Sequence, residues 1–148
     1  MDDDIQAMRD EYLNKEFDEV EFEVTATRIS EYARAAGELD NKFLDPEHED
    51  FQAPPTFAST FAGRRFLPDG FPRPKGVGMD AGKGVEWFAP IRAGVKLTGK
   101  THLHDIYTKT GRSGRMIFLV ARMELFDDAG THVANADTRT VIREQVDG

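Results

Sequence analysis

The sequence predicts an α+β domain in which a curved antiparallel sheet wraps around a central helix. The first half of the chain has the pattern of one strand followed by two helices, and the second half has four strand segments separated by turn signals. Residues 116–120, in the third of these segments, are apolar on both faces, which is typical of a strand that is covered on both sides. Helices that pack against one face of a curved sheet account for this order of elements.

The amino-terminal half supplies a strand and the first helix. Residues 1–15 are polar and predict a short helix or a loose arm. Over residues 19–24 glutamates alternate with valine and phenylalanine, which predicts a half-buried strand. Apolar residues recur at helical spacing over residues 28–37, and Thr25 or Thr27 can cap this helix at its start.

The second helix is expected to be the central one. Pro54 and Pro55 fit its first turn, where a missing N–H is tolerated. Phe57 and Phe61 are four residues apart and have small neighbours, so this helix is predicted to be buried and to run to about Phe66. A loop rich in proline and glycine follows, and then come the predicted strands over residues 84–88, 95–107, 115–126 and 131–143.

Length and composition narrow the class of protein. A chain of 148 residues predicts one domain over residues 1–148. The formal net charge of −8 disfavours nucleic acid and anionic membranes as partners. The absence of cysteine excludes disulfides, thiolate nucleophiles and cysteine-bound zinc. The acidic start lacks the apolar core of a signal peptide, and no apolar run approaches the roughly 20 residues that span a bilayer, so we expect a cytoplasmic protein.

Three segments carry a resemblance to a known family: residues 32–45 (YARAAGELDNKFLD), 53–57 (APPTF) and 87–97 (WFAPIRAGVKL). The first resembles the motif Y-A-x-x-[S/T]-G-D-x-N-P-[I/L]-H-x-D of the MaoC-like acyl-thioester hydratases and dehydratases. The second resembles the N-terminal-type half of that superfamily, which occurs in non-catalytic subunits of two-subunit bacterial dehydratases. The third resembles the family's (F/R)-x-P-I-x-x-G-D segment before a strand. The resemblance covers about residues 19–143 and implies a hot-dog fold.

The departures from the family pattern affect the catalytic groups. In catalytic members an Asp and a His, five residues apart, act as a matched acid/base pair on one water. Here Glu38 stands at the Asp position, and Phe43, which cannot exchange a proton, stands at the His position. Pro54-Pro55 falls where a backbone N–H helps to polarise the thioester carbonyl. The resemblance therefore implies a degenerate catalytic motif, in which Glu38 and Asp40 are the remaining candidates.

The resemblance implies a subunit of an (R)-specific enoyl-thioester hydratase or 3-hydroxyacyl-thioester dehydratase that shapes the acyl pocket beside a catalytic MaoC-like partner. The ligand would be an acyl-CoA or acyl-carrier-protein thioester, the assembly a homo- or heterodimer, and no cofactor or metal is expected. Two alternatives stay open: a stand-alone thioesterase or divergent hydratase that uses Glu38 or Asp40, and an acyl-CoA-binding module without turnover. The substrate channel is expected along the second helix, with the candidate binding residues Thr56, Phe57, Ser59, Thr60, Phe61 and Arg64.

Several polar residues outside the motif have two interpretations each. His48 is either a substitute acid/base or an exposed loop residue. His102 and His104 share one face of a strand and could chelate a metal, but no third ligand is evident, so a solvated strand face is the simpler interpretation. Arg64 and Arg65 either meet a phosphate of the carrier at the pocket rim or lie on a solvated helix face.

Overall fold

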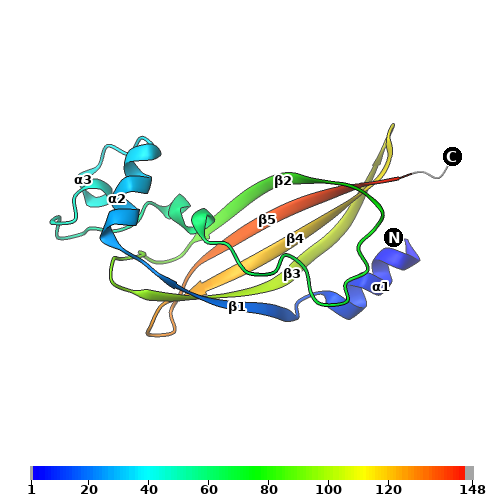
Figure 1. The fold of residues 1–148 in the computed structure, drawn as a ribbon, viewed down its shortest axis with the longest axis horizontal. Helices are drawn as coiled ribbons and strands as arrows, with labels where there is room; N and C mark the ends of the chain where they lie inside the picture. The colour runs from blue at the N-terminus through cyan, green and yellow to red at the C-terminus, as the bar shows by residue number, and fades with distance from the viewer. Residues whose placement is uncertain (1, 146–148) are drawn as a thin grey trace.

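The computed structural model describes residues 2–145, and its main feature is a five-stranded antiparallel sheet with the strand order β1-β3-β4-β5-β2 (Figure 1). Three long strands, β3 to β5, form the centre of the sheet, and β1 and β2 form its two edges. This arrangement confirms the predicted α+β class and the predicted curved sheet. The elements are α1 (Asp3–Tyr12), β1 (Glu16–Glu23), α2 (Ala26–Ala35), α3 (Asn41–Leu44), the 3₁₀ helix η1 (Pro55–Thr60), β2 (Gly76–Trp87), β3 (Lys96–Gly111), β4 (Gly114–Phe126) and β5 (His132–Glu144).

One face of the sheet, which we call the inner face, carries the apolar side chains. Because side chains alternate along a strand, every second residue of β3 from Leu97 to Leu103 is buried, whereas the residues between them are half-exposed. Leu125 of β4 and Ile142 of β5 are buried on the same face. The helices lie at the two ends of the long strands, with α2 and α3 at one end and α1 at the other (Figure 1).

The inner face holds two separate clusters of buried residues. The first, the η1 core, joins Ile29 of α2 and Phe57 of η1 to Leu97 and Leu125 of the sheet. The second, the α1 core, surrounds Ile5 of α1 and consists of Ile5, Leu103, Ile106, Ile117, Leu119 and Ile142. The middle of the inner face, between the two clusters, is therefore not filled by either helix.

The central helix is shorter than predicted, so the expectation that it runs to about Phe66 is wrong. It spans six residues and is a 3₁₀ helix. The hydroxyls of Ser59 and Thr60 donate hydrogen bonds of 2.8 Å to the carbonyl oxygens three residues earlier, and Phe61 closes the last turn on Ala58. Phe57 is nevertheless buried, with 1% of its surface exposed.

A carboxylate binds the backbone that follows the end of the helix. Asp18 of β1 accepts hydrogen bonds from the N–H groups of Arg64 at 2.8 Å and Arg65 at 3.2 Å. These N–H groups are therefore not available for the backbone hydrogen bonds of a helix. Residues 62–75, which we call the strap, consequently run along the inner face instead of forming a helix (Figure 1). A Cβ atom on Gly63 would lie 2.7 Å from Asp18 Oδ2, so this contact requires glycine.

The amino-terminal arm takes the helical one of its two predicted forms, and the first strand of the second half begins earlier than predicted. The arm is a helix rather than a loose segment, because Ile5 is fully buried and Arg9 forms an ion pair of 2.7 Å with Asp105 of β3. The strand expected over residues 84–88 begins at Gly76, inside the predicted loop. No helix within residues 2–145 is long and apolar enough to cross a membrane.

The burial of Phe57 gives a stability test. Phe57→Ala removes a fully buried ring that contacts Tyr32 and Phe61 at centroid distances of 5.4 and 5.3 Å, and we expect the free energy of unfolding to fall by about 3–5 kcal/mol. Leu39→Ala is the control, because Leu39 is 92% exposed and should change stability by less than about 0.5 kcal/mol. Urea unfolding of both variants measures the difference; equal losses would contradict a core centred on η1.

Candidate functional site

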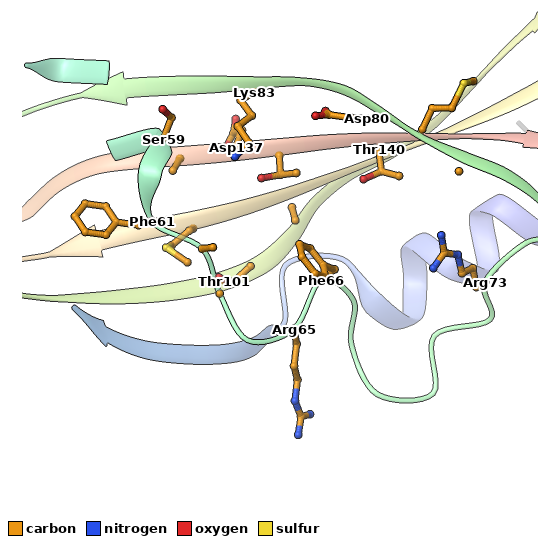
Figure 2. A pocket seen from close by; sticks show the side chains of 18 residues that line it. Ser59, Phe61, Arg65, Phe66, Arg73, Asp80, Lys83, Thr101, Asp137 and Thr140 are labelled. Carbon is orange, nitrogen blue, oxygen red and sulfur yellow. The ribbon is translucent and has the colours of Figure 1, made fainter. Parts of the chain in front are cut away.

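The unfilled middle of the inner face is a cavity of about 400 Å³, which we call the trough (Figure 2). Phe61 and Ser59 close its η1 side, and the strap crosses above it. Its floor comes from three neighbouring strands, and it is made of Thr101, Ala121, Met123, Ala136, Thr138 and Thr140. A second cavity of about 230 Å³ adjoins the trough toward α1 and shares Phe66, Arg73, Ala121, Thr138 and Thr140 with it.

The floor leaves space because its side chains are small. The rest of the inner face carries leucine and isoleucine. Here, by contrast, Ala121 pairs with Thr138, and Ala136 pairs with Met123. The second cavity is lined by Leu103, Leu119 and Ile142 of the α1 core together with Leu67 of the strap. Both cavities are mainly apolar, most of the charged groups lie at the trough, and together they suit a long ligand with an apolar tail.

The polar groups at the trough do not form an acid/base pair on one water. Asp137 is held by Arg122 through two hydrogen bonds of 2.8 and 2.9 Å, and Asp80 Oδ1 accepts the Gly82 N–H at 2.9 Å inside a bulge of β2. The hydroxyl of Thr101 is buried and has no hydrogen-bond partner among residues 2–145.

Two cations line the trough where β2 forms its wall. Arg73 comes from the strap and its guanidinium lies over Gly78, since a Cβ on Gly78 would be 2.9 Å from Arg73 Nη2. Lys83 follows the bulge of β2 and lies nearer to the η1 side of the trough than Arg73 does (Figure 2). Neither side chain forms an ion pair within residues 2–145, so both remain available to an anionic group of a ligand.

Of the six substrate-binding candidates from the sequence, Ser59 and Phe61 line the trough. Thr56 lies outside it, where its Oγ1 accepts a hydrogen bond of 2.8 Å from the Tyr32 hydroxyl, and Phe57 is part of the η1 core. A contact between any of these four residues and a substrate stays a prediction.

The other two candidates, Thr60 and Arg64, also lie outside the residues that line the trough. Thr60 uses its hydroxyl to close η1, and Arg64 contributes its backbone N–H to Asp18. Arg65 lies at the rim, but its side chain points away from the trough and forms an ion pair of 2.7 Å with Asp69 (Figure 2). Phe66 stood in the sequence only as one of several phenylalanines that could line the channel, and the floor residues were not predicted; their only signal is the change from leucine and isoleucine to alanine and threonine at inward positions.

The catalytic candidates lie away from the trough. Asp40 caps α3, because its Oδ1 accepts the Lys42 N–H at 3.0 Å. Glu38 is half-buried in the turn after α2, where its N–H donates to the Ala33 carbonyl at 2.9 Å. Phe43 lies beside the Lys42 ammonium, 5.0 Å from the ring centroid. None of these side chains lines the trough.

The start of η1 offers few backbone donors. The Ala53 N–H is used by the Ile91 carbonyl at 2.8 Å, and Pro54 and Pro55 have no N–H. Thr56 is therefore the first residue after Ala53 that has a backbone N–H. The loss of a carbonyl-polarising donor at this position, and its consequence for catalysis, stay predictions.

The histidines lie outside the trough as well. His48 Nδ1 accepts the Asp50 N–H at 3.0 Å, which fixes a local turn. His102 and His104 lie on the outer face with their rings 3.3 Å apart at Nε2 and Nδ1, and His102 Nδ1 is 3.4 Å from Glu124 Oε1. No group of three or more metal-ligating side chains occurs within the described part of the chain.

Comparisons with known proteins place this geometry in a family. The FAS1-like dehydratase domain region matches residues 13–136. A UPF0336 protein of Streptomyces avermitilis is 33% identical over 142 residues, which cover 86% of this chain and 89% of that protein.

Two solved structures have the same fold. The C-terminally truncated HadBC complex of Mycobacterium tuberculosis, a (3R)-hydroxyacyl-ACP dehydratase, contains a chain that is 23% identical with a TM-score of 0.63, over 82% of this chain and 90% of that one. A MaoC-like dehydratase of Phytophthora capsici is 25% identical with a TM-score of 0.69, over 94% of this chain and 50% of that one.

The sheet, the short central helix and these matches define a hot-dog fold of the MaoC-like dehydratases and hydratases. Within that class, the chain belongs to the FAS1-like dehydratase domain region family.

The outer-face histidine gives a pH test. Burial lowers the pKa of the His102 imidazole below its usual value of 6.5, and the nearby Glu124 carboxylate partly opposes this shift. The unfolded chain therefore binds a proton more readily than the folded one, so stability is retained above about pH 6.5 and falls as the pH decreases through that value. We expect His102→Gln to reduce the loss of stability between about pH 7.5 and about pH 5.5.

The opposing carboxylate supplies the second arm of this test. Glu124→Gln removes the charge that favours the protonated imidazole, and the loss of stability at low pH should then become larger. Urea unfolding at the two pH values measures both variants. An unchanged pH dependence in His102→Gln would show that other groups determine it.

Proposed function

We propose that this chain is the non-catalytic subunit of an (R)-specific enoyl-thioester hydratase or 3-hydroxyacyl-thioester dehydratase, and that its trough holds the acyl chain of the substrate beside a catalytic MaoC-like partner. The observation that carries the proposal is the pairing of a roughly 400 Å³ cavity, apolar toward α1, with the lack of an acid/base pair among its lining residues. The first feature suits binding, and the second leaves the chemistry to another chain.

The lack of an acid/base pair follows from how the carboxylates are used. Hydration of an enoyl thioester needs one group to activate a water and one to supply a proton at Cα. Of the two carboxylates at the trough, Asp137 is ion-paired with Arg122 and Asp80 accepts the Gly82 N–H. Asp40 caps α3 away from the trough. Phe43 at the family's His position can do neither task. A partner with an intact Asp and His would supply both groups.

The two edges of the sheet differ in a way that favours pairing through β2. Four glutamates lie on β1, and charges on an edge strand oppose the addition of another strand. β2 instead exposes 55% of Val77 and 45% of Met79. Gly78 to Lys83 of β2 also form a wall of the trough, so a partner joined at this edge would lie next to the acyl site.

The comparisons support pairing with a second hot-dog chain. HadBC is a complex of two kinds of chain. The match to the P. capsici protein covers 94% of this chain but only 50% of that one, so the longer chain has room for a second domain of the same size. The free cations Arg73 and Lys83 would face the phosphates of the carrier at the open side of the trough. Both coenzyme A and an acyl carrier protein present such a phosphate, and the same cations suit either carrier.

The activity test compares the chain alone with the assembled enzyme. We expect the purified chain to hydrate crotonyl-CoA and longer enoyl-CoAs at least about 100-fold more slowly than the same chain co-expressed with a catalytic partner from a neighbouring gene, because the acid/base pair is absent. Glu38→Ala should leave both rates unchanged, and Ala121→Phe, which fills the trough floor, should lower the rate of the assembly. Robust turnover by the chain alone that Glu38→Ala abolishes would instead establish a stand-alone hydratase.

The assembly test compares the two edge strands. Met79→Lys places a charge on the exposed apolar edge of β2, and we expect it to shift the protein from dimer to monomer in light scattering at micromolar concentration. Glu21→Lys on β1 is the matched control, because it changes an edge that already carries charge, and it should leave the dimer intact. If Glu21→Lys dissociates the assembly and Met79→Lys does not, pairing occurs through β1.

A further inference from the structure

Phe66 is an aromatic residue that the packing of the chain does not explain. It lies in the strap and is 75% exposed, whereas Phe57 and Phe61 of η1 are buried. A large apolar ring in water forgoes the stabilisation that burial would give. Figure 2 shows its ring directed over the trough, while the side chain of Arg65 beside it is directed away. This orientation suits contact with a ligand rather than with the protein core.

The strap holds Phe66 in this position from both sides. On one side the Arg64 and Arg65 N–H groups are bound to Asp18. On the other side Leu67 and Phe71 pack against the α1 core, and the Tyr12 hydroxyl donates a hydrogen bond of 2.9 Å to the Gly70 carbonyl. Phe66 is therefore a free ring on a fixed backbone, and its side chain can move without loss of these anchors.

The ring stands where the two cavities meet. Phe66 lines both the 400 Å³ trough and the 230 Å³ cavity next to it, together with Arg73, Ala121, Thr138 and Thr140. Below it the floor is formed by the small Ala121 and the two threonines, so the ring lies over the boundary that the two cavities share. The cavity beyond the passage is lined by Leu67, Leu103, Leu119 and Ile142. These are aliphatic side chains, which suit the far end of an acyl chain.

We propose that Phe66 sets the length of acyl chain that the trough accepts. With the ring over the floor, the acyl chain is confined to the larger cavity; with the ring removed, the chain also reaches the apolar cavity toward α1. Each methylene that is transferred from water into the site should raise affinity about fourfold, so affinity rises with chain length and stops rising where the ring blocks the passage. This inference rests on the proposed function of the trough as the acyl site.

The test is a chain-length series. Saturated acyl-CoAs from butyryl-CoA to palmitoyl-CoA are titrated by calorimetry into the full chain, in the assembly in which it purifies. For the wild type we expect affinity to rise with length and then reach a plateau. For Phe66→Ala the rise should continue over several further methylenes, each contributing about fourfold, while short chains bind no more tightly than before. Phe66→Leu should give an intermediate limit.

The control is Phe88→Ala, which removes another half-exposed phenylalanine that lies against His132 and outside both cavities. It should reproduce the wild-type plateau. A plateau at the same chain length in wild type, Phe66→Ala and Phe88→Ala would overturn the role of Phe66 while leaving the trough as the acyl site. Affinity that does not depend on chain length in any of the proteins would overturn both this inference and the proposed function. Since Phe66 is exposed, its removal is not expected to unfold the chain.

Discussion

The site depends on one carboxylate, Asp18, which binds two successive backbone N–H groups of the strap. A helix that continued past Thr60 would use these groups in its own ladder and would fill the middle of the inner face. Asp18 binds them instead, after η1 has ended at Thr60, and holds the chain along the sheet. The close approach at Gly63, where no Cβ can be accommodated, fits the same contact. The trough is the volume that this interaction leaves unfilled.

A sheet with an unfilled middle still needs a core, and here two clusters at its ends provide it. The η1 core and the α1 core each bury their apolar residues against the same long strands, so β3 to β5 run through both clusters. The amino-terminal helix is essential to this division, because Ile5 is the centre of the second cluster. Arg115 of β4 further fixes the start of the chain through Asp2 and Asp4. Without that helix, the apolar side of the second cavity would be open to water.

The strands were predictable because their signal is local, whereas the length of the central helix was not. Alternation of apolar and polar residues gave β1 and β3 to β5 closely. The path of the chain after η1 is held by Asp18, which lies 46 residues before Arg64, and no local pattern reveals that contact. The early start of β2 was not predicted, because glycines and the prolines before them indicate a loop. The strand forms there because its backbone pairs with β5, which a local pattern does not reveal. The floor of the trough likewise forms only once strand register brings Thr101, Ala121 and Thr138 together.

The family motif and the trough lie in different parts of the molecule, which explains how the motif can diverge while the fold is kept. The carboxylates of the motif segment have local structural partners: Asp40 binds the Lys42 N–H, and Asp45 binds the Glu47 N–H at 2.9 Å. The segment is tied to the rest of the chain by the Gln52 N–H, which donates to the Lys42 carbonyl at 2.8 Å, and by the contact of Tyr32 with η1. None of these interactions requires a proton-transferring residue at position 43. Position 43 can therefore carry phenylalanine without loss of the trough, because the residues that line the trough lie elsewhere in the chain, as the proposed division between binding and catalysis requires.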